Sequence, residues 1–341
     1  MKKIILGLAA AVFAGATSLA VTTGALADGH SNVKPALVYD LGGKNDKSFN
    51  ESAFTGAERF KTETGIEYKD FEIQNDAQRE QAMRRFARDG HNPVVAIGFS
   101  HAAAMEKVSQ EFPDTKFAIV DMVVNQPNVR SILFTEHEGS YLVGVMAAKA
   151  SKSGKVGFVG GMDIPLIRKF ACGYVQGVKS VNADYEVFQN MTGTTGAAWN
   201  DPVKGGELAK SQIERGADVV YHAAGGTGIG VLQAAADAGA LGIGVDSNQN
   251  GMHPGKVLTS MLKRVDNAVY NAFMDVKDDK WSTGFNVLNL KAGGVGYAMD
   301  DNNKSLVDAD MKAAVEAAEA AITSEAVKVH DYMSDSACPV Q

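Results

Sequence analysis

The chain has 341 residues, 45% of them hydrophobic, and a formal net charge of −7 at pH 7. This acidic balance disfavours nucleic-acid backbones and anionic membrane surfaces as partners. Its two cysteines, Cys172 and Cys338, form no Cys-x-x-Cys pair and no His/Cys cluster, so neither a structural zinc site nor another metal site is expected.

The first 27 residues read as a secretory signal peptide. Lys2 and Lys3 supply the positive charge, Ile4–Ala20 is largely apolar, and Ala25–Ala27 is an A-x-A cleavage site. A membrane anchor is the alternative, but Gly, Thr and Ser interrupt the apolar stretch. Cleavage after Ala27 would leave 314 residues and, with both lysines lost, a charge of −9. We expect a periplasmic protein without a lipid anchor, because no cysteine lies near the cleavage site.

Strands alternate with helices along the remaining chain, which indicates parallel sheets. The first predicted series is, in chain order, strand 36–40, helix 49–64, a strand ending at 73, helix 76–89, strand 94–97, helix 100–112, strand 117–120 and strand 129–134. The second is helix 140–151, strand 156–159, helix 165–181, strand 185–189, helix 202–215, strand 219–222, helix 229–238, strands 241–245 and 257–261, and helices 265–276 and 309–323. Because 314 residues exceed what one core usually carries, we predict two α/β lobes with a cleft between them.

Several of these helices carry N-cap signals. Ser48 with Glu51 three residues later fits a capping box, in which the hydroxyl accepts from a free amide and the carboxylate reaches back. Asp76, Ser100 and Asp201 are the predicted caps of three later helices.

The loop Gly42–Asn50, between the first strand and the first helix, is the main candidate for ligand binding. Open α/β folds bind ligands at such strand-to-helix turns. Asn45, Asp46 and Phe49 give this loop an amide, a carboxylate and an aromatic ring. That mixture suits a flat, hydrogen-bonding ligand better than a phosphate, and we predict that the loop holds a nucleobase.

Other polar or glycine-rich residues follow later strands. They are Asp40, Asp121 and Asp246, and the loops 98–100, 160–162 and 225–228. Since the carboxyl ends of parallel strands share one edge of a sheet, these residues should gather at one cleft. The run Gly225–Gly228 could bind phosphate at a helix N-terminus, but it lacks the GxxxxGK[ST] form. Close backbone approach to an uncharged ligand and a plain turn are the alternatives.

Sugar recognition and stacking have candidates in the second series. Asp246 could accept two hydrogen bonds from a vicinal diol, or it could be a turn former. Lys263 could stand beside that diol, or it could be a solvated surface lysine. Phe49 and Trp199, one from each lobe, could close on both faces of a base, although Phe49 could instead be a core residue.

Catalysis has little support in the sequence. There is no GxSxG or HExxH motif, and the histidines show no paired spacing. Asp46, Asp121 and Asp246 could form an acid/base set only if they clustered on a metal or an attacking water. Cys172 could be a nucleophile only if reduced, whereas an oxidising compartment favours a disulfide with Cys338. Spacing alone does not show that the two cysteines meet. We expect neither an enzyme nor a cofactor.

The ordered set of motifs resembles the basic membrane protein (BMP) family of solute-binding proteins. The resemblance spans residues 34–275 and rests on ALVYD at 36–40, NDKSFN at 45–50, AIVD at 118–121, EGSYLVG at 138–144, KVGFVGGM at 155–162 and GIGVDSNQ at 242–249. It implies a type I periplasmic-binding fold, with two Rossmann-like lobes, parallel sheets and three crossings. The implied N-terminal lobe is 33–135 plus 262–288, and the implied C-terminal lobe is 138–258 plus 290–335.

The resemblance also implies a function. Such proteins deliver a ligand to the permease of an ABC importer, and characterised members bind purine nucleosides. We therefore expect a monomeric receptor for guanosine, inosine or adenosine that closes its lobes on the ligand and partners an inner-membrane permease. A receptor for a sugar or other small polar solute, a receptor for a membrane signalling partner and a nucleoside-cleaving hydrolase are the alternatives. Many relatives are lipoproteins, but the missing cysteine argues for a free protein here.

Nine positions match the ligand-binding residues of the family: Asn45, Asp46, Phe49, Asn50, Asp121, Trp199, Gly226, Asp246 and Lys263. By this resemblance Asn45 and Asp46 would meet the purine edge, with Asp121 close to the same end of the pocket. Phe49 would stack on one face of the base. Trp199 stands where the family commonly has Phe. Asp246 and Lys263 would hold the ribose hydroxyls, with Gly226 near the sugar.

Overall fold

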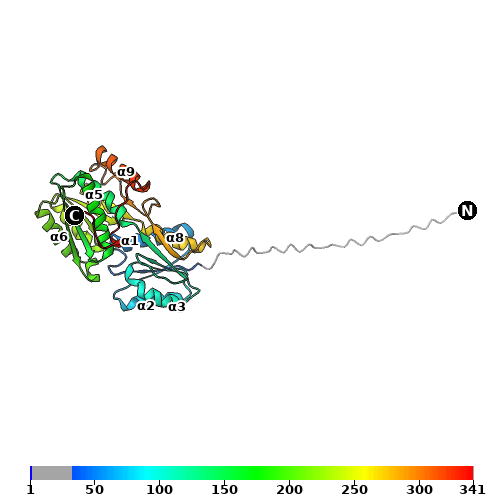
Figure 1. Ribbon diagram of the computed structural model, residues 1–341. Coiled ribbons are helices and arrows are strands. Elements are labelled where there is room, and N and C mark those ends of the chain that lie inside the picture. The colour runs from blue at the N-terminus through cyan, green and yellow to red at the C-terminus, as the bar shows by residue number, and fades with distance from the viewer. Residues whose placement is uncertain (2–32, 341) are drawn as a thin grey trace. The chain divides into compact units, whose positions relative to one another are not determined.

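The computed structural model describes Met1 and residues 33–340 (Figure 1). The predicted signal peptide and its cleavage site lie outside these described residues. Within this part of the chain, no helix combines the length and apolar character that crossing a membrane would require.

The first sheet contains the strands of the predicted first series. Its order is β11 (Gly284–Leu288), β5 (Val129–Phe134), β4 (Phe117–Val120), β3 (Val94–Ala96), β1 (Ala36–Tyr39) and β2 (Lys69–Glu72), all parallel. The central strands β1, β3 and β4 are apolar runs that are buried throughout. Such runs are typical of parallel strands with both faces covered.

The second sheet repeats this layout. Its order is β12 (Val295–Tyr297), β10 (Val257–Lys263), β9 (Leu241–Asp246), β8 (Val219–Ala223), β6 (Lys155–Met162) and β7 (Glu186–Gly193). Only β12 among these strands runs antiparallel to its neighbour. The prediction of two α/β lobes with parallel sheets is thereby confirmed.

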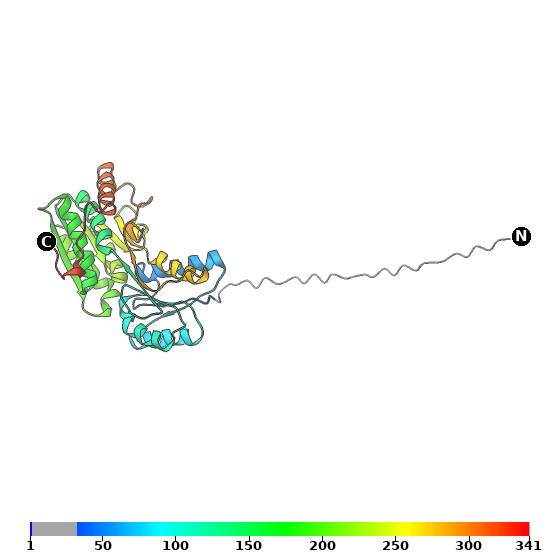
Figure 2. The ribbon, with the colours of Figure 1, turned by 45° about the vertical axis from the view of Figure 1, so that its right-hand side comes forward.

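Helices cover both faces of each sheet. They are α1 (Phe49–Thr64), α2 (Ala77–Arg88), α3 (Ala102–Glu111), α4 (Glu136–Ala150), α5 (Pro165–Val181), α6 (Pro202–Glu214), α7 (Gly228–Asp237), α8 (Val265–Lys277) and α9 (Ala309–Thr323). In the first lobe α2 and α3 cover one face and α1 with α8 the other, as Figure 2 shows. In the second lobe α6 and α7 cover one face and α4 with α5 the other.

The chain crosses between the sheets three times. It leaves the first sheet after β5, returns through α8 to β11, and leaves again to reach β12. Strand β10 stays in the second sheet up to Lys263. The detailed lobe limits remain a prediction.

Two strands were missing from the sequence prediction. Strand β11 is an edge strand with exposed Phe285 and Val287, and β12 lies in a segment read as turns. Both are short and at sheet edges, so their strand state depends on a partner far along the chain. For β11 that partner is β5, about 150 residues earlier.

The predicted helix caps had mixed outcomes. The Asp201 carboxylate accepts from the Lys204 amide at 2.9 Å, which confirms that cap. The Asp76 carboxylate makes no cap hydrogen bond and pairs with the Arg79 guanidinium at 3.1 Å instead. Ser100 was also wrong as a cap, since it lies inside the short 3₁₀ helix Phe99–His101 that precedes α3.

Candidate functional site

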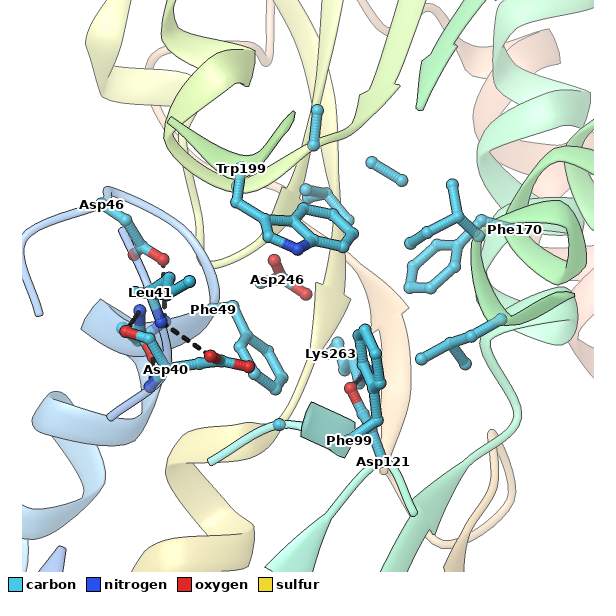
Figure 3. A pocket seen from close by; sticks show the side chains of 18 residues that line it. Asp40, Leu41, Asp46, Phe49, Phe99, Asp121, Phe170, Trp199, Asp246 and Lys263 are labelled. Atoms are coloured by element: carbon cyan, nitrogen blue, oxygen red, sulfur yellow. Dashed lines mark hydrogen bonds and ion pairs between the residues drawn. The ribbon is translucent and has the colours of Figure 1, made fainter. Parts of the chain in front are cut away.

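A pocket lies between the carboxyl ends of the two sheets (Figure 3). The space between its lining atoms, open solvent included, is about 600 Å³. Its lining is Asp40, Leu41, Asp46, Phe49, Asn50, Gly98, Phe99, Asp121, Leu166, Ile167, Phe170, Trp199, Ala223, Ala224, Gly225, Val245, Asp246 and Lys263. Seven of the nine residues that the resemblance implied therefore line one pocket, and Asn45 and Gly226 do not.

Asp46 holds the first loop in shape by capping α1. Its carboxylate accepts from the amides of Ser48, Asn50 and Glu51 at 2.8, 3.0 and 3.1 Å. Burial raises the pKa of this carboxyl, and the three amide hydrogen bonds oppose that shift. The predicted capping box is wrong, because Ser48 makes no cap hydrogen bond and Glu51 accepts from Lys47 rather than Ser48. The carboxylate of Asp46, two residues before the cap position, accepts from the free amides of the first turn instead.

The Ser48 hydroxyl instead bridges the two lobes. It donates to Asp246 Oδ2 at 2.5 Å, and the Ser247 hydroxyl donates to the Ser48 carbonyl at 2.9 Å. Beside them the Gln249 amide donates to the Lys47 carbonyl at 2.9 Å. The N-terminus of α1 is thus hydrogen-bonded to the end of β9 and the loop that follows it.

Asp121 and Asp246 occupy matching positions at the ends of β4 and β9. Both have left-handed backbones, with φ of 69° and 64°. Asp tolerates this region better than most residues, but the conformation still costs energy and is concentrated at functional sites. Burial raises the pKa of Asp121 to about 6 and that of Asp246 to about 7, while the Lys263 charge acts to lower both. Two strained strand ends thus place titratable carboxylates at the pocket.

Of the described residues, Lys263 is the one cation that lines the pocket, and it is buried rather than solvated. Its ammonium lies 2.6 Å from Asp121 Oδ2 and 2.9 Å from Glu136 Oε1. It also lies 5.1 Å from the ring centre of Phe49. Burial acts to lower the lysine pKa, but the neighbouring carboxylates raise it above its ordinary value, so the ammonium stays charged.

The position of Asp121 corrects one expectation. The resemblance placed it with Asn45 and Asp46 at the end of the pocket opposite Lys263. In the structure it is paired directly with Lys263, and Figure 3 shows it apart from Asp46. Its second oxygen, Oδ1, is buried and has no hydrogen-bond partner among the described residues. That oxygen is free to accept from a ligand.

Glu136 and Lys169 belong to the same charge cluster, and sequence reasoning missed both. Glu136 Oε2 lies 2.9 Å from the Lys169 ammonium, which also donates to the Phe134 carbonyl at 2.8 Å. Burial acts to raise the pKa of Glu136, but Lys263 and Lys169 together lower it to about 2. The predicted helix started at Ser140, whereas α4 begins at Glu136. The signal available was an acidic residue directly after a buried strand.

Aromatic rings line the pocket from both lobes. Phe49 comes from the first turn of α1, and Trp199 from the short 3₁₀ helix Gly196–Trp199 of the second lobe. Gly161 leaves room for the indole, because a Cβ there would lie 2.3 Å from Trp199 Cζ3. Phe99, from the loop 98–100 that was expected at the cleft, and Phe170, which was not predicted, also line the pocket. Figure 3 shows Trp199 and Phe49 on opposite sides of the space.

The remaining predicted residues have other surroundings. Asn50 lines the pocket, but its side chain accepts from the Asp40 amide and donates to the carbonyls of Asp40 and Gly43. Asn45 is exposed. Gly226 lies behind Trp199, where a Cβ would be 3.3 Å from the Trp199 carbonyl oxygen. Asn50 therefore fixes the loop that presents Asp46.

Asp40 is held from behind by a buried arginine. The Arg79 guanidinium lies 2.7 Å from Asp40 Oδ1 and 3.2 Å from His101 Nε2. Burial lowers the pKa of His101 to about 4, so the imidazole is neutral at pH 7. This cluster keeps Asp40 directed at the edge of the pocket.

The structure joins Cys172 to Cys338 by a disulfide, across a sequence separation of 166. Cys172 lies on α5, and the bond holds the C-terminal tail against that helix. Neither cysteine is free. In the described residues no group of three or more His, Cys, Asp or Glu side chains is placed to hold a metal ion.

Comparisons with known proteins give the family. A family model described as ABC transporter substrate-binding protein, PnrA-like (Bmp) matches residues 33–331. The ABC transporter nucleoside-binding protein BmpA of Lactococcus lactis subsp. cremoris is 34% identical over 354 residues, covering 95% of this chain and 99% of that protein. An uncharacterized lipoprotein of Pyrococcus furiosus is 35% identical, covering 78% of this chain and 70% of its own length.

A solved structure agrees with this assignment. The crystal structure of ABC transporter system solute-binding proteins from Aeropyrum pernix K1 matches with a TM-score of 0.80 and 30% identity, covering 87% of this chain and 92% of that one. The two parallel-sheet lobes of the present chain are those of the type I periplasmic-binding fold that the resemblance implied. The chain therefore belongs to the PnrA-like (Bmp) family of ABC transporter substrate-binding proteins.

Proposed function

We propose that this substrate-binding protein captures a purine nucleoside in the cleft between its lobes. One observation carries the proposal: aromatic rings from both lobes line a pocket whose charged lining, among the described residues, is one paired lysine and four aspartates. A base stacked between rings gains about 1–3 kcal/mol per contact. The relative from Lactococcus lactis is named as a nucleoside-binding protein, which supports the same ligand class.

The charged residues that line the pocket favour an uncharged nucleoside over a nucleotide. The lining aspartates are Asp40, Asp46, Asp121 and Asp246. Lys263 is already paired with Asp121 and Glu136, so it has no charge left over for a phosphate. A phosphorylated ligand would enter a site of net negative charge without a free cation, whereas an uncharged nucleoside meets acceptors for its hydroxyl and amino groups.

We assign the ribose hydroxyls to Asp246 and Lys263. A carboxylate is an acceptor with two oxygens, and an ammonium supplies donors, which together match a vicinal diol. A ligand without the diol would make neither hydrogen bond to these two buried groups, so its affinity should be much lower. Asp46 and the surrounding loop then face the base, as the motif resemblance implied.

Ligand binding would favour the closed arrangement of the lobes. Phe49 belongs to the first lobe, and Trp199 and Asp246 belong to the second. A ligand that contacts both sets binds the closed form better and so increases its population. The closed monomer would then be recognised by an ABC permease of the inner membrane, with the binding protein free in the periplasm and without enzymatic activity.

Thermal unfolding with and without ligands tests this proposal. Guanosine, inosine or adenosine should raise the melting temperature, since a ligand that binds only the folded state stabilises it. Free purines and 2′-deoxyribonucleosides should raise it much less. Equal shifts with ribose and deoxyribose compounds would contradict the Asp246 assignment. A shift with monosaccharides but with no nucleoside would replace the proposal by a sugar receptor, and release of hypoxanthine from inosine would indicate a hydrolase.

A further inference from the structure

The buried lysine of the pocket is held by a carboxylate that it shares with a second lysine. Glu136 Oε1 lies 2.9 Å from the Lys263 ammonium, and Oε2 lies 2.9 Å from the Lys169 ammonium. The Glu136 side chain is 1% exposed, so solvent screens neither pair strongly. A change in the charges around Lys169 therefore changes how strongly Glu136 holds Lys263.

Lys169 depends on a second carboxylate, which comes from the C-terminal tail. Asp331 Oδ2 lies 3.5 Å from the Lys169 ammonium. His137, also near Asp331, has its pKa lowered by burial and by the charge of Lys169, and so adds no cation. Burial acts to lower the pKa of Lys169, but Glu136 and Asp331 raise it. Asp331 is thus the second carboxylate that balances Lys169, a buried lysine that shares Glu136 with the pocket residue Lys263.

The tail is fixed where it can supply this charge. The His330 amide donates to Gln176 Oε1 at 2.8 Å, and Gln176 Nε2 donates back to the His330 carbonyl at 3.0 Å. The disulfide between Cys172 and Cys338 closes the other end of the segment. Both anchors are on α5, the helix that carries Lys169, so residues 330–338 and Lys169 are held on one rigid element.

We infer that the C-terminal tail takes part in ligand binding, with Asp331 acting through Lys169 and Glu136 to position Lys263. This inference rests on the proposed nucleoside function. Without Asp331, Lys169 is balanced by Glu136 alone and draws that carboxylate away from Lys263. Lys263, still paired with Asp121, then moves toward Asp246, where it occupies an acceptor that the ligand needs. Asp331 and Lys169 are therefore positioning residues that do not touch the ligand.

Affinity for guanosine, measured by titration calorimetry on the full chain, tests the inference. Asp331→Asn should raise Kd about fivefold, the scale typical of coupling through a packed network. Asp335→Asn is the matched control, because Asp335 lies in the same tail but pairs with His330 rather than Lys169. Its Kd should equal that of the unaltered protein.

A double-mutant cycle separates positioning from general structural damage. In a Lys169→Met background, Asp331→Asn should no longer change Kd, because the group through which Asp331 acts is gone. An equal loss of affinity in both backgrounds would overturn the inference in favour of a purely structural role. An unchanged Kd for Asp331→Asn, in a protein that binds guanosine, would overturn it as well.

A second measurement needs no ligand and keeps this inference distinct from the proposed function. In protein labelled with ¹⁵N at the lysine side chains, the Lys263 ammonium signal is identified by its loss in Lys263→Met. Asp331→Asn should shift that signal and speed its hydrogen exchange, and Asp335→Asn should not. If guanosine fails to bind while the signal shifts, the proposed ligand is wrong and the coupling stands. An unmoved signal would refute the coupling whatever the ligand.

Discussion

At the scale of single residues, Asp246 combines a strained backbone with a carboxyl whose charged form the fold disfavours. Its φ is 64°, it is 7% exposed, and burial raises its pKa to about 7. The ordinary pKa of an aspartate is about 3.9. The folded protein therefore binds a proton more tightly here than the unfolded chain does, and this group lowers stability as pH rises from about 4 to about 7.

Because the ionised Asp246 carboxylate lowers stability, removing its charge should stabilise the protein and at the same time weaken ligand binding. Asp246→Asn should raise the melting temperature of the ligand-free protein at pH 8 by a few degrees and leave it unchanged near pH 4. Asn tolerates the left-handed backbone, so no new strain is added. The affinity of the unaltered protein for guanosine should rise between pH 5.5 and 8, as Asp246 loses its proton. The variant should bind guanosine more weakly at pH 8 and should show a smaller rise over the same range. A lower melting temperature at pH 8 would contradict the argument.

At the scale of one element, the Ser48/Glu51 motif predicted the start of α1 correctly but predicted the wrong capping side chain. Ser48 occupies the cap position, but the Asp46 carboxylate takes three amides of the first turn. An anionic cap also suits the positive end of the helix dipole. The Ser48 hydroxyl is thereby released to contact Asp246 in the other lobe.

Asp46→Ala should therefore destabilise the protein by about 1–2 kcal/mol, the upper part of the range for losing a helix cap. Urea unfolding followed by circular dichroism measures this change. Glu51→Ala is the control, because the Glu51 carboxylate contacts Lys47, through a largely exposed ion pair and a 3.2 Å hydrogen bond from the Lys47 amide, and its loss should cost less than about 0.5 kcal/mol. Equal costs for the two variants would restore the capping-box interpretation.

At the scale of the whole molecule, the disulfide connects the far end of the chain to the lobe that carries half of the pocket. It closes a loop with a sequence separation of 166, from α5 through the second crossing between the lobes and back to the tail. A cross-link of this kind restricts the unfolded chain more than the folded one.

Cys172→Ser/Cys338→Ser should lower the free energy of unfolding by about 2–5 kcal/mol. Urea titration without reductant measures the loss, and the unaltered protein with excess reductant should approach the same midpoint. Coincident midpoints for the variant and the oxidised protein would show that the bond adds no stability.

Much of the fold could be predicted because its central elements are specified locally. Strands β1, β3 and β4 are apolar runs buried on both faces, and helix α5 begins at Pro165, a residue favoured in the first turn. The edge strands β11 and β12 could not be recognised in the same way. Their residues are partly exposed, and only pairing with distant strands makes them part of a sheet.

The sequence by itself determined the alternation of strands and helices, and with it the placing of Asp40, Asp121 and Asp246 at the carboxyl ends of parallel strands, because the polarity of such strands follows from chain order. Only the tertiary structure decided which charges meet. Glu136, Lys169 and Asp331 come from two helices and the tail, and no local pattern shows that their side chains converge behind Lys263. Burial and pairing are properties of the packed molecule, so they set the charge and position of the site's lysine only after the chain has folded.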